Sequence, residues 1–238
     1  MSFATMFGHT FVTKFCILLV YTYICNMTPN KMANITDFVP DDFYQRRVSH
    51  FASLEVRRDN IVMLGDSLIN GCEWHELLQD ARILNRGINS DTIEGVRQRM
   101  GNIVNGKPQK VFVMVGINDV SHHIEATEIA CHIVALADEI HRQSPSTQVY
   151  IHSLLPFDAS IYYSTLMGKE DDVIEINRLL QQASKGENYV FIDLYSHMTD
   201  STGKILDSRY TNDGLHLNGN GYNLWAKVIE PYINTEKR

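Results

Sequence analysis

The chain has 238 residues, of which 44% are apolar and 21% are charged, close to the averages of ordinary globular proteins. Its 21 Lys and Arg against 28 Asp and Glu give a net charge of −7, which argues against a protein whose main task is to neutralise nucleic-acid phosphates. Six Pro and 14 Gly are too few for a collagen-like or low-complexity chain. The length suits one large domain or two small ones.

The first apolar segment covers residues 15–24 and follows Lys14. It is shorter than the roughly 20 residues that a membrane-spanning helix needs, and its length and basic flank are typical of a secretory signal peptide. We therefore expect a signal peptide or N-terminal extension over residues 1–26 and a linker over 27–40. A working signal predicts a secreted, periplasmic or cell-envelope protein, and without one the protein would be cytoplasmic. Cys25 could carry a lipid anchor, but Tyr23 and Ile24 are bulkier than lipoprotein signals usually allow.

Two cysteines, Cys72 and Cys131, lie in the body of the chain, and no CxxC pair is present. A zinc ribbon or a thioredoxin-like motif is therefore unsupported. We expect both side chains to act as small buried hydrophobic groups. The sequence leaves open whether they form a disulfide.

From about residue 60 onward, short apolar runs alternate with helical patterns. Short β-branched runs between turn signals indicate strands buried on both faces. The strands are expected at residues 61–64, 82–85, 111–115, 149–151 and 189–192, and the helices at 41–55, 92–104, 129–140, 174–180 and 221–233. This alternation predicts an α/β fold, with a parallel sheet between two helical layers.

Ligands of such sheets bind beyond the carboxyl ends of the strands. The long aromatic segment 156–172 follows the fourth strand. We expect it to lie at that edge and to contact the substrate, although a surface insertion is an alternative.

A serine directly follows the first predicted strand, in the sequence Gly65-Asp66-Ser67-Leu68. A serine at a tight strand-to-helix turn projects its hydroxyl above the sheet edge. The pattern is not the G-x-S-x-G elbow of α/β-hydrolases, because Ile69 stands where the second glycine would be. Taken alone, the turn fits a helix cap as well as a nucleophile.

An acid and a base stand near the carboxyl end of the chain, in the sequence Asp213-Gly214-Leu215-His216. A serine hydroxyl needs a base such as histidine to take its proton, and a carboxylate then orients the imidazole. The D-x-x-H spacing is common, so a surface histidine is the alternative. A metal site has less support, because no further ligands lie nearby. The adjacent pair His122 and His123 is expected to face solvent.

Acyl transfer also needs donors aimed at the oxyanion. Three are available in principle: the backbone N–H of Ser67, the N–H of Gly87 in the sequence NRGIN, and the side-chain amide of Asn118 in the sequence GIND. Each of the last two segments follows a predicted strand. Either could also be an ordinary turn.

The four motifs GDSL, NRGIN, GIND and DGLH together resemble those of the SGNH hydrolases, also called the GDSL esterase/lipase family, over about residues 60–233. The resemblance implies Ser67 as nucleophile, His216 as general base and Asp213 as its orienting acid. It also implies that Gly87 and Asn118 complete the oxyanion hole. The expected fold is a flavodoxin-like three-layer α/β/α sandwich with a five-stranded parallel sheet, without metal or organic cofactor, in a single domain over residues 41–238.

The motifs look most like those of the branch that holds platelet-activating-factor acetylhydrolase catalytic subunits and bacterial acetylesterases. This implies a serine esterase for short-chain, chiefly acetyl, esters of carbohydrates or small molecules. A lysophospholipase or thioesterase of the same family is the alternative enzyme. A carbohydrate- or lipid-binding module without chemistry is the alternative from another class. A nucleotide receiver ranks last, because no GxGxxG or Walker pattern follows the first strand.

Overall fold

The computed structural model describes residues 41–162, 165–186 and 188–234. The predicted leader and linker lie outside this range, as do Cys16 and Cys25, so the export signal stays a prediction. In the described part of the chain, no helix is both long and apolar enough to cross a membrane.

Five parallel strands form the sheet, in the order β2-β1-β3-β4-β5. This is the strand order of flavodoxin-like folds and confirms the predicted fold class. The carboxyl ends of β2, β1 and β3 lie level, because Gly65 pairs with both Gly87 and Met114. The order of the strands reverses at β1, so the crevice above β1 and β3 is where this fold binds its ligands. The strands are β1 (Ile61–Gly65), β2 (Ile83–Gly87), β3 (Lys110–Met114), β4 (Gln148–His152) and β5 (Val190–Ile192).

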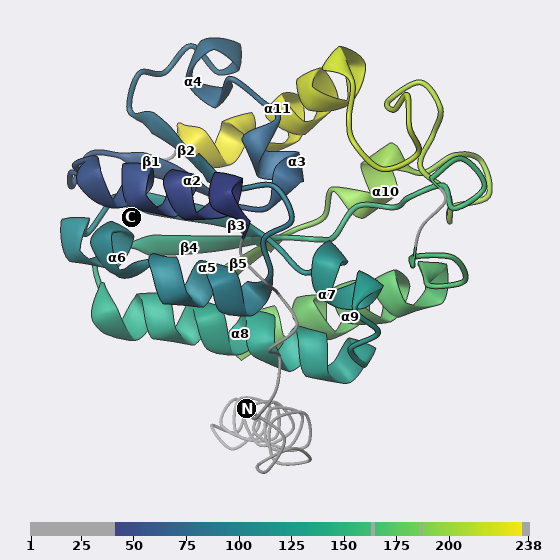
Figure 1. Ribbon diagram of the computed structural model, residues 1–238, viewed down its shortest axis with the longest axis horizontal. Coiled ribbons are helices and arrows are strands. Elements are labelled where there is room, and N and C mark those ends of the chain that lie inside the picture. The colour runs from purple at the N-terminus through teal and green to yellow at the C-terminus, as the bar shows by residue number, and fades with distance from the viewer. Residues whose placement is uncertain (1–40, 163–164, 187, 235–238) are drawn as a thin grey trace, which may run out of the picture.

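Helices cover both faces of the sheet in one domain. Figure 1 shows α5, α6, α8 and α9 on one side and α4 and α11 on the other. Four of the five helices expected from the sequence are present as single helices, and the fifth segment, 92–104, is divided into two. Short helices that the sequence did not indicate are also present. The helices are α2 (Asp42–Ser53), α3 (Ser67–Asn70), α4 (Trp74–Leu77), α5 (Ile93–Arg99), α6 (Gly101–Gly106), α7 (Ile117–Ser121), α8 (Ala126–Gln143), α9 (Glu170–Ala183), α10 (Tyr195–Met198) and α11 (Gly219–Ile233), with a 3₁₀ turn η1 (Ser184–Gly186).

The segment expected as one helix over residues 92–104 consists of two helices. The break falls at Met100, which ends α5 and precedes α6. Gly101 follows at once, and glycine is among the poorest helix formers. The hydrophobic period continues through the break, with Val96, Ile103 and Val104 all buried, so the pattern alone predicts one helix.

The central strands β1 and β3 are almost wholly apolar because they are buried on both faces. Every residue of β1 and β3 is buried, as expected where helices cover both faces of a parallel sheet. Even Lys110 is buried, and its ammonium group donates to the carbonyls of Tyr232 and Ile233 at the end of α11, where a cation is favoured. Cys72 is buried and Cys131 half-buried, and they form no disulfide with each other.

Candidate active site

The turn after β1 presents Ser67 at the carboxyl edge of the sheet. A side chain at Gly65 would collide with the Met114 carbonyl, 1.8 Å from the ideal Cβ position, so the strand needs glycine here. Asp66 caps α3 by accepting the Leu68 N–H at 3.0 Å. Asp66, and not Ser67, is therefore the helix cap. Ser67 is the first residue of α3, and its hydroxyl is left for another partner.

That partner is His216. The Oγ of Ser67 lies 3.1 Å from Nε2 of His216, and Nδ1 of the same ring lies 2.7 Å from Oδ2 of Asp213. If Nδ1 carries the ring proton and donates a hydrogen bond to the carboxylate, Nε2 is free to accept the hydroxyl proton of the serine. All three side chains are partly exposed, so a substrate could reach them. His122 and His123 are exposed, as expected from the sequence.

The loop that carries Asp213 and His216 is held by its own hydrogen bonds. Oδ1 of Asp213 accepts the N–H groups of Leu215 at 2.9 Å and His216 at 2.7 Å. The hydroxyl of Thr211 donates to the carbonyl of His216 at 2.7 Å. Burial opposes ionisation of Asp213, but the hydrogen bonds from the His216 ring and from these N–H groups outweigh it and hold its pKa below the usual range. A charged carboxylate therefore faces the imidazole.

Asn118 follows β3 and lies near the start of α7. Its amide nitrogen donates one hydrogen bond to the carbonyl of Asp91 at 2.8 Å. Because an amide nitrogen carries two hydrogens, one remains for a substrate. Asp91 is itself held by Arg99 at 2.6 Å and by the hydroxyl of Tyr44 at 2.9 Å. No pattern in the sequence indicated that these side chains support Asp91.

The backbone N–H of Gly87 was expected to be open to an oxyanion, but it is already bound within the protein. Its N–H donates to Oδ1 of Asn85 at 2.8 Å, so it is engaged within the protein instead of being open to a substrate. Its Cα faces α3, where an added Cβ would lie 2.2 Å from the backbone nitrogen of Asn70. Glycine is needed here for the close approach of β2 and α3. Asn85 also binds the carbonyls of Ile69 and Cys72, each at 2.9 Å, so it fastens α3 to the sheet.

The loop just beyond Gly87 is better placed to offer a donor. Asn89 is bound to Asn70, which ends α3, at 2.9 Å, and Asp91 is bound to Asn118. Ser90 stands between these two anchors, is exposed and has a φ of 61°. Its N–H makes no hydrogen bond to any described residue.

Two buried carboxyl groups lie behind the site. Oδ2 of Asp66 and Oδ1 of Asp119 have no hydrogen-bond partner among the described residues. Burial, together with a smaller contribution from repulsion by the Asp91 carboxylate, raises the pKa of each to about 7. Both residues belong to motifs that the sequence singled out, but the motifs indicated nothing about their burial. Groups of three His, Cys, Asp or Glu side chains that could hold a metal do not occur within the described ranges.

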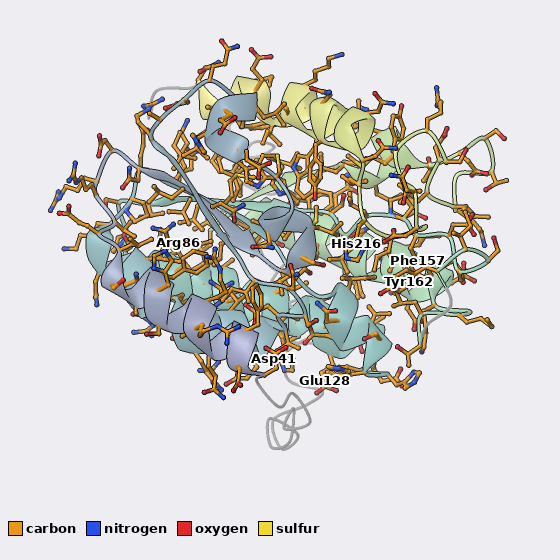
Figure 2. All side chains as sticks on the ribbon, turned by 45° about the horizontal axis from the view of Figure 1, so that its top comes forward. Asp41, Arg86, Glu128, Phe157, Tyr162 and His216 are labelled. Carbon is orange, nitrogen blue, oxygen red and sulfur yellow. The ribbon has the colours of Figure 1, made fainter. Side chains whose placement is uncertain are left out.

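The segment after β4 reaches the site, as expected from the sequence. The rings of Tyr162 and His216 meet edge to face, with their centroids 6.2 Å apart and their planes at 76°. Figure 2 shows Tyr162 and Phe157 near His216, at the end of the molecule away from Arg86.

A serine–histidine–aspartate arrangement at the carboxyl edge of a flavodoxin-like sheet defines a class of hydrolases. Residues 63–224 match the model of the GDSL-like Lipase/Acylhydrolase family. The chain therefore belongs to this family and is a carboxylic ester hydrolase.

Its curated relatives include the human platelet-activating factor acetylhydrolase IB subunit alpha2, which is 27% identical over 208 residues, 82% of this chain and 84% of the relative. Two solved structures show the same fold. A GDSL-like lipase from Bacteroides thetaiotaomicron matches with a TM-score of 0.70 and 22% identity, over 80% of this chain and 96% of that one. An acetyl-xylooligosaccharide esterase mutant from Geobacillus matches with a TM-score of 0.59 and 16% identity, over 77% and 98%.

Proposed function

We propose that the protein is a serine esterase that works through an acyl-Ser67 intermediate. The observation that carries this proposal is the continuous chain of contacts from Ser67 Oγ to His216 and on to Asp213. Such a chain lets the imidazole take the serine proton while the carboxylate stabilises the imidazolium that results.

The reaction has two halves. Ser67 Oγ attacks the ester carbonyl while its proton passes to Nε2 of His216, and collapse of the tetrahedral intermediate breaks the bond to the alcohol, which leaves with that proton. A water then gives its proton to Nε2 and attacks the acyl-serine carbonyl. The second collapse returns the proton to Ser67 Oγ and releases the carboxylic acid.

Three donors would stabilise the oxyanion: the N–H of Ser67, the second amide hydrogen of Asn118 and the N–H of Ser90. Ser90 takes the place of Gly87, whose N–H is occupied by Asn85. Ser67 begins α3, and the first N–H groups of a helix have no partner within it. The anchors on either side of Ser90 fix its loop between the helices that carry Ser67 and Asn118. Fixed donors of this kind need no reorganisation when charge develops.

The substrate we propose is a short-chain ester, chiefly an acetate, of a carbohydrate or another small alcohol. The acyl half is supported by the relative whose name describes an acetylhydrolase. The same name refers to platelet-activating factor, so an acetylated phospholipid is the second candidate. Acyl-chain profiling from acetyl to palmitoyl esters would test the acyl half, with the rate expected to fall as the chain lengthens.

The test of the proposed function is Ser67→Ala, assayed with p-nitrophenyl acetate. Turnover should fall to background while the circular dichroism spectrum and the melting temperature stay close to those of the wild type. Ser53→Ala, at an exposed position that ends α2, is the matched control and should keep full turnover. Full activity in Ser67→Ala would refute the proposal.

A further inference from the structure

The segment after β4 is fastened to the loop that carries Asp213 and His216. The N–H of Asp158 donates to the carbonyl of Gly214 at 2.7 Å. Gly214 has a φ of 88°, and a Cβ there would lie 2.6 Å from the carbonyl oxygen of Asp158. That oxygen also accepts the Tyr162 N–H at 2.9 Å. Residues 158–162 thus form a fixed turn against the loop of the base.

This turn places the Tyr162 ring against the imidazole of His216. In the proposed mechanism, Nε2 of this imidazole gives its proton to the departing alcohol, so Tyr162 contacts the residue that serves the leaving group. The Tyr162 ring meets the His216 ring edge to face and is only partly buried. Ile161 is 47% exposed beside it. An aromatic ring in this position offers a flat face to the alcohol half of the ester.

The other end of the turn opens into a polar pocket of about 690 Å³. This volume falls within the range typical of small-molecule sites. Asp158 lines the pocket together with residues 199–201 and 205–209. Oδ2 of Asp158 and Oδ2 of Asp200 make no hydrogen bond to a described residue, so both can accept hydrogen bonds from hydroxyl groups.

The charge of the pocket selects among alcohols. It contains the three carboxylates of Asp158, Asp200 and Asp207, and one guanidinium, that of Arg209, which is paired with Asp207 at 2.7 Å. The unbalanced negative charge disfavours an alcohol that bears a phosphate. Neutral hydroxyl groups, which both donate and accept, fit this lining.

We propose that Tyr162 and this pocket form the subsite for the alcohol half of the substrate, and that the alcohol is a neutral, hydroxyl-rich molecule of the sugar or polyol class. The proposal rests on the proposed esterase function and names the substrate class for the same site. Tyr162 acts as a specificity-determining residue, which packs against the alcohol while Asp158 and Asp200 accept hydrogen bonds from its hydroxyl groups.

The test compares kcat/KM for glucose monoacetate with kcat/KM for p-nitrophenyl acetate, whose alcohol carries no hydroxyl groups for the pocket. Tyr162→Ala should lower this ratio about tenfold, and so should the double variant Asp158→Asn/Asp200→Asn, since a lost pair of modest contacts is worth about 1.4 kcal/mol. Asparagine keeps the Oδ1 acceptors that hold the two turns, so the double variant decides the matter even if Tyr162→Ala does not fold. Phe43→Ala, at an exposed aromatic of α2, should leave the ratio unchanged.

Two results would overturn the proposal. One is an unchanged ratio in the folded variants. The other is a wild-type enzyme that prefers hexyl acetate or an acetylated phosphocholine lipid to glucose monoacetate. Either result leaves the esterase function standing as long as p-nitrophenyl acetate is hydrolysed through Ser67, whereas loss of that hydrolysis in the wild type would remove the proposed function itself.

Discussion

Replacing Asp66 by Asn should change how the stability of the protein depends on pH. Burial raises the pKa of Asp66 from 3.8 to about 7. In the unfolded chain the carboxyl releases its proton near pH 4, whereas in the folded protein it keeps the proton up to about pH 7. Between these values the folded state binds more protons than the unfolded state. The contribution of Asp66 to the free energy of unfolding is therefore fully present below pH 4 and is lost as the pH rises to about 7.

The expected size follows from the shift. At about 1.4 kcal/mol per pKa unit, the wild type loses about 4 kcal/mol through Asp66 by pH 8. For a chain of this length that corresponds to a drop in the melting temperature of about 8–16 °C. Asp66→Asn keeps the Oδ1 acceptor for Leu68 and cannot ionise. Its amide hydrogens lose their water partners on burial, which costs about 1–3 kcal/mol at every pH.

Urea unfolding of both proteins from pH 4.5 to 8 is the measurement. The free energy of unfolding should fall more steeply with pH in the wild type, and the difference between the two proteins should change by several kcal/mol in favour of Asp66→Asn. In the variant, the free energy of unfolding should still fall with pH, but less steeply, because burial also raises the pKa of Asp119 to about 7. Asp59→Asn, at an exposed turn, should keep the wild-type slope. Parallel curves for Asp66→Asn and the wild type would refute the reasoning.

Three further changes separate the roles of the loops around the site. Asn118→Ala should lower kcat for p-nitrophenyl acetate about 100- to 1,000-fold through the loss of an oxyanion donor, and an unchanged kcat would remove Asn118 from that role. Gly87→Ala should lower the melting temperature by several degrees, because its Cβ would lie 2.2 Å from the Asn70 nitrogen; calorimetry showing the wild-type value would contradict this. Ser90→Gly should keep kcat within about twofold, because the proposed donor is the backbone N–H and glycine adopts a positive φ freely; a large loss of kcat would point to the Ser90 side chain instead.

The strands and the grouping of Ser67, His216 and Asp213 could be predicted from the sequence for a physical reason. Buried parallel strands are short, apolar and bounded by turns, and their carboxyl ends meet at one edge of the sheet. Residues that follow such strands, such as Ser67 after β1 and Asn118 after β3, therefore stand at the same edge of the sheet although they are distant in the chain. The D-x-x-H spacing brought Asp213 and His216 within one turn, as expected.

What the sequence did not predict depends on single side-chain contacts. Gly87 has a motif and a position suited to an oxyanion donor, but Asn85, two residues earlier, accepts its N–H. Asp91 is fixed by Arg99 and Tyr44, which lies 47 positions away. No periodicity or spacing reports such a contact, because each depends on how the backbone brings distant groups within hydrogen-bond reach.

If Ser67 is the nucleophile, a reagent that traps activated serines should capture it covalently. The wild-type protein is incubated with a fluorophosphonate, digested, and its peptides are identified by mass spectrometry, with Ser67→Ala treated in the same way. We expect one modified peptide that contains Ser67, competition between labelling and p-nitrophenyl acetate, and no label in the variant. Stoichiometric labelling of another residue, or labelling that persists in Ser67→Ala, would contradict it.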